Sequence, residues 1–214
     1  MRILIRGFGE LCITAGLILL LFVTYELWGT GQYTEKQQDE LGKQLTRDWG
    51  TTERVRLGRG MALLRIPRLG QDYRYVVIEG VGPEDLRKGP GHYPGTALPG
   101  QLGNFVVSGH RTTYSAPFNR VDELRAGDRI LVDTRTEQLI YSVTGREIVA
   151  PSAIAVTAPV PFHPKQAASK RLITLTTCHP KFSAAKRMII FGELTQRRPR
   201  TTPGGTPSNA SGGI

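Results

Sequence analysis

A charge-free apolar run near the N-terminus is the feature that most constrains how this chain can fold. Residues 11–25 contain no charged side chain, and residues 17–23 are all aliphatic or aromatic. With its apolar flanks the run approaches the roughly 20 residues that cross the hydrocarbon core of a bilayer. Arg2 and Arg6 precede it, and the positive-inside rule then holds the N-terminus in the cytoplasm. We therefore predict a transmembrane anchor over residues 8–28, with the rest of the chain outside the cell.

A cleaved signal peptide is the alternative interpretation of this segment, because the charge-free run is short. Residues 25–32 lack a convincing small-x-small cleavage site, which favours an uncleaved anchor. Cys12 lies inside the run and is interpreted as an apolar membrane residue. Cys178 is the other cysteine of the chain, so no intramolecular disulfide is expected in an oxidising exterior.

The chain is strongly basic, with a formal net charge of +10 and a pI of about 10.0. Such a balance suits an acidic partner, and anionic lipid, an acidic cell envelope and nucleic acid all qualify. The sequence contains no Cys/His zinc spacing, no phosphate-cradling glycine loop and no clear basic recognition helix. We expect a membrane partner and no nucleic acid, with a merely solubilising basic surface as the alternative.

Three regions follow the predicted anchor. Residues 29–60 are polar and mixed in charge, and Leu41 and Leu45 recur at helical spacing, which predicts a stalk helix that holds a domain off the membrane. Residues 61–195 alternate between short apolar runs and Gly/Pro turns, as in a folded domain. Residues 196–214 have almost no apolar content, which predicts a disordered basic tail.

The predicted domain is mainly β. Within residues 138–149, Ile140, Ser142 and Thr144 alternate with Tyr141 and Val143, as in a half-buried strand. Seven or eight such runs with few helical stretches predict a barrel or a sandwich, and the residues alone leave both open. One short helix is predicted over residues 116–124. The predicted strands cover residues 62–66, 74–79, 104–108, 129–133, 138–149, 172–177 and 188–193.

The predicted strand over residues 172–177 leads directly into Cys178, and Pro180 closes it. A lone thiol at a strand end is either an inert core residue or a nucleophile. A nucleophile needs a partner that handles its proton and a group that stabilises the oxyanion formed on attack. His179 adjoins the thiol in sequence. Because successive side chains of a strand point to opposite faces, His179 cannot meet the thiol in an extended chain.

Two residues elsewhere in the chain fit these roles. His110 follows an apolar strand that ends in a glycine and precedes a polar loop, where barrels display functional groups. Arg187 opens the last predicted strand, so neighbouring strands would bring its guanidinium beside Cys178. A structural histidine and a solvated strand-edge arginine are the alternatives. His92 and His163 lie in Gly/Pro-framed turns and are interpreted as structural.

The order of these motifs resembles that of sortases, and the resemblance covers most of the predicted domain. It rests on Thr174-Leu-Thr-Thr-Cys178, on Ser108-Gly-His110 upstream and on Arg187 downstream. Residues 91–100 and 109–118 resemble the class E branch, which is typical of high-GC Gram-positive actinobacteria. Class D is the nearest alternative.

Sortases are membrane-anchored cysteine transpeptidases. The resemblance therefore implies a single eight-stranded β-barrel with short helices, preceded by one transmembrane helix. It implies Cys178 as the nucleophile, His110 as the general acid/base and Arg187 as the group that stabilises the oxyanion or holds the substrate. On the same basis Tyr114 would contact the substrate, and Thr177 would bond the substrate or orient Arg187.

The partners implied by the resemblance are surface proteins with a C-terminal sorting signal and the amine of a peptidoglycan precursor. The signal would resemble Leu-Pro-x-Thr-Gly in general and Leu-Ala-x-Thr-Gly in class E. The sequence contains no acidic cluster that matches the calcium site of class A enzymes, and we expect neither a metal nor a cofactor.

Two other functions remain as alternatives. A hydrolytic cysteine peptidase would use the same thiol, although a papain-like protease places its cysteine before its histidine and this chain has the reverse order. An L,D-transpeptidase would need a Ser-His-Gly-type approach to its cysteine, which is absent. A non-catalytic basic domain that binds the cell envelope would explain the charge and the anchor. It would leave the arrangement of Cys178, His110 and Arg187 as coincidence.

Overall fold

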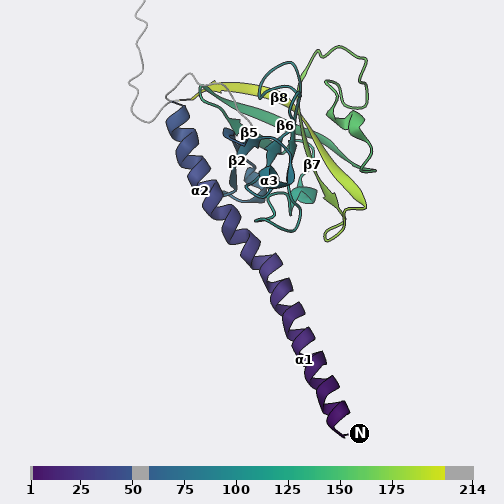
Figure 1. Cartoon of the computed structure of the whole chain (residues 1–214). Coiled ribbons are helices and arrows are strands. Elements are labelled where there is room, and N and C mark those ends of the chain that lie inside the picture. The colour runs from purple at the N-terminus through teal and green to yellow at the C-terminus, as the bar shows by residue number, and fades with distance from the viewer. Residues whose placement is uncertain (1, 50–57, 201–214) are drawn as a thin grey trace, which may run out of the picture.

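The computed structural model describes residues 2–49 and 58–200, and it begins with a long helical segment. Helix α1 (Arg2–Thr24) passes through one π-helical turn (Tyr25–Gly29) into helix α2 (Thr30–Asp48). Figure 1 shows α1 projecting away from the β domain while α2 lies along it. Within α1, Ile5–Thr24 form a 20-residue stretch long and apolar enough to cross a membrane, and none of it is buried. This helix is consistent with the predicted anchor.

Helix α2 packs on the β domain and does not stand free of it. Leu41 and Leu45 are buried against Val76 and Ile78. The predicted helical spacing of the leucines is therefore confirmed. The apolar stripe of α2 finds a partner on the outside of the barrel and is removed from water there.

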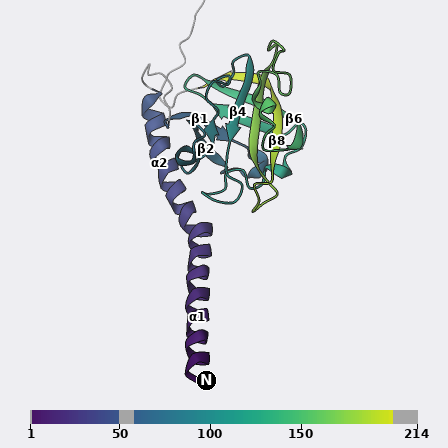
Figure 2. The same cartoon turned by 45° about the vertical axis from the view of Figure 1, so that its right-hand side comes forward.

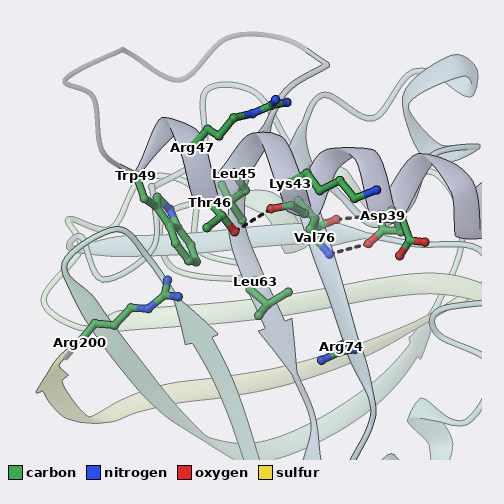
Figure 3. Close-up of a pocket in the computed structure, with 12 residues that line it drawn as sticks. Asp39, Lys43, Leu45, Thr46, Arg47, Trp49, Leu63, Arg74, Val76 and Arg200 are labelled. Atoms are coloured by element: carbon green, nitrogen blue, oxygen red, sulfur yellow. Dashed lines mark hydrogen bonds between the residues drawn. The ribbon is translucent and has the colours of Figure 1, made fainter. Parts of the chain in front are cut away.

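A groove of about 780 Å³ separates the C-terminal half of α2 from the strands beneath it. Figure 3 shows Leu63 on its floor and Trp49 and Arg200 at one side. The Arg200 guanidinium carbon lies 3.5 Å from the centroid of the Trp49 ring. This contact ties the last residue of the helical segment to the end of the final strand.

The β domain is one closed barrel of eight strands in the order β1-β2-β3-β4-β7-β8-β6-β5. The pairs β2–β3 and β4–β7 are parallel and the others are antiparallel. Of the two architectures that the residues left open, the structure confirms the barrel, which the sortase resemblance implied, and excludes the sandwich. The strands are β1 (Gly60–Arg65), β2 (Arg74–Glu79), β3 (Gly91–His92), β4 (Gly103–Ser108), β5 (Arg129–Asp133), β6 (Glu137–Val149), β7 (Arg171–His179) and β8 (Lys186–Pro199).

The sequence patterns missed or misjudged three elements. Strand β3 is only two residues long and is framed by glycine and proline, so it shows no alternation. The helix predicted over residues 116–124 is reduced to a 3₁₀ turn at Val121–Glu123. Other short helices are α3 (Pro83–Leu86) and 3₁₀ turns at Pro67–Leu69 and Ile154–Thr157.

The tail predicted from residue 196 is the third correction. Strand β8 continues through Pro199, because residues up to that point pair with the beginning of β6. Ladder hydrogen bonds to β6 order these polar residues without any apolar contribution of their own. The remainder of the predicted tail, residues 201–214, lies outside the described residues.

The core fills the barrel, and alternation sorts the side chains of each strand. Phe105 and Val107 of β4 belong to the interior cluster, as do Ile173 and Leu175 of β7 and Met188 and Ile190 of β8. Because side chains alternate along a strand, the positions between them face outward. Ser108, Thr176, Cys178 and Arg187 thus belong to the outer face of the barrel.

Candidate active site

Cys178 lies near the end of β7, where the thiol is half-buried on the outer face of the barrel. The strand ends one residue later, at the residue before Pro180. We call this end of the barrel, formed by the last residues of β4 and β7 and the first of β8, the thiol end. A thiol in this position is accessible to a substrate, in contrast to a core cysteine.

Arg187 is the direct cross-strand neighbour of Cys178. The antiparallel register of β7 and β8 pairs these two residues and continues without a shift from Leu172↔Glu193 to His179↔Lys186. Side chains at directly paired positions stand about 5 Å apart on one face. The guanidinium donates hydrogen bonds to the carbonyl oxygens of Ala184 and Lys186, at 3.0 and 3.1 Å. These bonds hold a permanently charged donor group on the face that carries the thiol.

His110 lies on the other side of Cys178, just beyond the end of β4. Strands β4 and β7 run parallel with Ser108 level with Thr176, and the backbone N–H of Gly109 donates to the Thr176 carbonyl at 3.1 Å. His110 is two residues beyond Ser108, and Cys178 is two residues beyond Thr176. The three residues named from the sequence therefore follow or belong to three adjacent strands, β4, β7 and β8, at the same end of the barrel.

The imidazole of His110 is held in an environment that favours its neutral form. Its ring lies 5.0 Å from the ring of Tyr114, and the Arg87 guanidinium lies 5.8 Å from the same Tyr114 ring. Burial lowers the pKa of His110 below its usual value, and the positive charge of Arg87 lowers it further. A neutral imidazole at pH 7 can accept a proton, as a general base must.

The loop after His110 is fixed in an unusual conformation by contacts outside the barrel. Tyr114, Ser115 and Ala116 all have positive φ, at 52°, 57° and 42°. The N–H of Tyr114 donates to the Thr30 hydroxyl at 3.3 Å, and the Ser115 hydroxyl donates to the Gly31 carbonyl at 3.0 Å. A conformation that L-residues rarely adopt persists only where such contacts enforce it. Tyr114 is thereby presented beside His110.

Thr177 and His179 have side chains on the opposite face from Cys178. The Thr177 hydroxyl is buried and donates to the Gly109 carbonyl at 2.7 Å, which ties β7 to the residue before His110. His179 lies one position beyond Cys178 in an unbroken register, as the alternation argument required. His92 is buried, with Nδ1 2.6 Å from a Glu79 carboxylate oxygen, consistent with a structural role.

Sequence reasoning missed Arg87 and Thr30 as neighbours of the site. Arg87 follows α3 and is one of 28 Lys and Arg residues, so no pattern singled it out. Thr30 belongs to a helix that the sequence assigned to a stalk. Its burial, with 4% of the residue exposed, is the signal that the helix is packed, and it appears only in the tertiary structure.

Comparison with known proteins agrees with this geometry. The family model described as Sortase domain matches residues 64–195. The chain is 36% identical over 208 residues to Sortase SrtE1 of Streptomyces coelicolor, an alignment that covers 92% of this chain and 58% of the relative. The chain thus spans less than two thirds of that relative's length.

Two solved structures have the same fold. Sortase E from Streptomyces avermitilis is 38% identical, with a TM-score of 0.62 over 68% of this chain and 93% of the other. The SrtF sortase from Corynebacterium diphtheriae is 32% identical, with a TM-score of 0.67 over 74% of this chain and 95% of the other. The resemblance to class E is therefore confirmed, and the chain belongs to the sortase family.

Proposed function

We propose that this chain is a membrane-anchored cysteine transpeptidase that attaches surface proteins to a cell-wall amine. The observation that carries the proposal is the strand register. It pairs Cys178 with Arg187 across β7 and β8, and it aligns Ser108, two residues before His110, with Thr176, two residues before Cys178. A thiol, a proton-handling imidazole and a fixed cationic donor are what covalent acyl transfer needs.

In the first step the Cys178 sulfur attacks the carbonyl carbon of the threonine in the sorting signal. The thiol proton passes to His110, and the guanidinium of Arg187 stabilises the oxyanion of the tetrahedral intermediate. When the C–N bond to glycine breaks, His110 returns the proton to the departing amine. The products are a thioacyl enzyme and the free C-terminal fragment.

In the second step an amine of a peptidoglycan precursor attacks the thioester carbonyl. His110 takes a proton from this amine and returns it to the sulfur as the C–S bond breaks. One amide has been exchanged for another, and the thioester conserves the acyl energy between the two steps without ATP. The reaction requires neither a metal nor a cofactor, and calcium is expected to leave turnover unchanged.

Tyr114 and Thr177 receive supporting roles in the proposal. Tyr114 stands beside His110 on a constrained loop and would contact the sorting signal near its second residue. Thr177 would act through its bond to the Gly109 carbonyl, which sets the position of His110 relative to Cys178. If Tyr114→Phe leaves the preference between Ala- and Pro-containing signals unchanged, Tyr114 has no part in signal selection.

The proposed topology follows the charge distribution. Residues 8–28 would anchor the chain with Arg2 and Arg6 in the cytoplasm, and the barrel would lie outside the cell. The apolar helix Ile5–Thr24 supports an anchor of this kind. Fusing a reporter to each end of the chain would test the orientation.

The decisive experiment uses the full chain in detergent with two peptides, one containing Leu-Ala-x-Thr-Gly and one Leu-Pro-x-Thr-Gly. Glycine or a diaminopimelate-type amine serves as the acceptor. We expect cleavage between Thr and Gly, faster for the Leu-Ala peptide, and a product extended by the amine. Cleavage that yields only the free acid at saturating amine would indicate a hydrolytic peptidase.

The control for the envelope-binding alternative is labelling with a thiol-reactive sorting-signal peptide. The parent chain should be labelled and Cys178→Ala should not. Equal labelling of the two proteins would contradict catalysis at Cys178.

A further inference from the structure

Helix α2 fixes the direction in which the thiol end of the barrel points. Its first residues, Thr30 and Gly31, hold the loop that follows His110. Its last residues approach the opposite end of the barrel, where Arg200 stacks on Trp49. The helix therefore runs along the barrel from the thiol end to the other end, and α1 leaves the barrel on the thiol side.

The thiol end is also close to the candidate membrane span. The span ends at Thr24, and the helical backbone continues without a break to Thr30. At a rise of 1.5 Å per residue these six residues advance about 9 Å. The headgroup region of a bilayer is about 5–8 Å thick on each side. The contact between Thr30 and Tyr114 thus lies near the outer edge of the headgroups when α1 crosses the membrane.

The loop between β7 and β8 reaches toward the same height above the membrane as the contact between Thr30 and Tyr114. In Figure 1 and Figure 2 the tip of this yellow-green loop lies at the lower end of the barrel, level with the junction of α1 and α2. Phe182 in this loop is 80% exposed and has a φ of 64°. The backbone of the loop is ordered by a turn in which the Ser183 N–H donates to the Pro180 carbonyl at 3.1 Å.

The charge of this surface matches an anionic partner. Residues 180–187 contain Lys181, Lys186 and Arg187 and no acidic residue, and residues 109–118, which form the neighbouring loop, contain no acidic residue either. Lys181 donates to Asn119 Oδ1 at 2.9 Å, and Glu123 is the carboxylate on which its charge acts. Lys and Arg near a membrane are attracted to anionic headgroups, and an aromatic ring with polar surroundings is suited to the interface.

We propose that the loop of residues 180–186 docks on the surface of an anionic bilayer, with Phe182 inserted among the headgroups and Lys181 and Lys186 against their phosphates. This interaction rests on α1 spanning the membrane, as in the proposed function. The bilayer is then a second attachment point for the barrel, in addition to the helix. Cys178 lies two residues before Pro180, so this docking brings the thiol close to the membrane surface, within reach of a substrate held in the bilayer.

The first test measures the depth of residue 182 in the full chain reconstituted in phosphatidylglycerol vesicles. Phe182→Trp is made in a Trp28→Phe/Trp49→Phe background, and its fluorescence is quenched with lipids brominated on the acyl chain. The matched control is Leu102→Trp in the same background. Leu102 is 52% exposed and precedes the start of β4, at the far end of the barrel.

We expect residue 182 to be quenched at least about twofold more than residue 102, because only the former is inserted. The excess should fall in phosphatidylcholine vesicles and in a Lys181→Gln/Lys186→Gln variant. Equal quenching at the two positions in anionic vesicles overturns the proposal. If the loop contacts a protein substrate and not lipid, quenching at residues 182 and 102 should be equal. In that case Phe182→Ser should also slow cleavage of the peptide.

The second test uses the unmodified chain and hydrogen exchange. Backbone amides of residues 181–186 should exchange more slowly in phosphatidylglycerol vesicles than in detergent, while those of residues 101–103 should not change. Identical exchange of residues 181–186 in the two media overturns the docking.

Three outcomes distinguish a failure of the docking from a failure of the proposed function. Chain released from vesicles by an alkaline wash overturns both the span and the docking. Chain that is retained, cleaves the soluble signal peptide in detergent and shows no excess quenching at residue 182 overturns the docking alone. Chain that docks but does not cleave the peptide overturns the enzymatic function alone.

Discussion

The two ends of the barrel use polar groups in opposite ways. At the end around Gly100, polar atoms converge on one another. The Gly100 N–H donates to the Tyr141 hydroxyl at 2.8 Å, and the Gly100 carbonyl accepts from Arg171 at 2.9 Å and also from Arg197. Asn104 nearby donates to two carbonyls of the loop before β7, at 2.9 and 3.1 Å.

At the thiol end Arg187 donates to two carbonyls of its own loop, but the side chains of Cys178 and His110 stand outside such a network. In residues 2–49 and 58–200 no hydrogen bond to protein is described for the Cys178 thiol or the His110 imidazole. Their positions are set indirectly, through Thr177, Thr30 and the register of three strands. One end of the barrel uses its polar groups for stability, and the other leaves the thiol and the imidazole available for a substrate.

The sharpest test of this contrast is Cys178→Ala. Removing the nucleophile should lower transpeptidation by at least about a thousandfold, because the remaining groups cannot form the thioester. The thermal midpoint should stay within about 2 °C, since the side chain is on the outer face and fills no core space. Steady-state assays and calorimetry measure the two effects. Cys12→Ala, in α1, is the matched control and should retain full activity.

Arg187→Lys is expected to have the next largest effect. Lysine keeps the charge but loses the planar fork of donors, so activity should fall about 10²–10³-fold. The matched control is Arg197→Lys, at the other end of the same strand. It should lower the thermal midpoint through the lost bond to Gly100 and leave activity unchanged. A loss of activity in both variants would contradict the division between the two ends.

Tyr141→Phe tests the Gly100 end. Burial raises the pKa of Tyr141 to about 12, so its hydroxyl is protonated at all physiological pH values and accepts from the Gly100 N–H. Without it a buried N–H has no partner, and the free energy of unfolding should fall by about 1–3 kcal/mol. Denaturant titration measures this. Activity per folded molecule should not change. A change of more than about tenfold would show that the Gly100 end influences catalysis at the thiol end.

Arg87→Gln should give the smallest and most specific effect. Tyr114 of its own loop lies 5.0 Å from the His110 ring, and Arg87, the residue after α3, is the charge that acts on it. Removing the positive charge of Arg87 raises the pKa of His110, since that charge disfavours the protonated imidazole. The acidic limb of the pH profile of kcat/KM should therefore move to higher pH. Arg120→Gln, an exposed arginine paired with Glu123, is the control and should leave the limb in place.

Local patterns predicted most of the strands and the three residues at the thiol end. Strands β2 and β5 have the predicted bounds, because their β-branched runs are bounded by clear turns. Strand β3 could not be found, since two residues carry no periodicity. The packing of α2 was also missed, because Leu41 and Leu45 would show the same four-residue spacing on a free amphipathic helix and on a docked one.

The sequence by itself determined the apolar helix at the N-terminus, the β character of the domain and the face of Cys178 relative to His179. These follow from composition and from the two-residue period of a strand, which are local properties. Only the tertiary structure decided that β4 lies parallel to β7, that the charge of Arg87 acts on His110, and that α2 holds the His110 loop. These contacts join segments distant in the chain, and their choice depends on strand order and on the surface buried between elements, which no local pattern encodes.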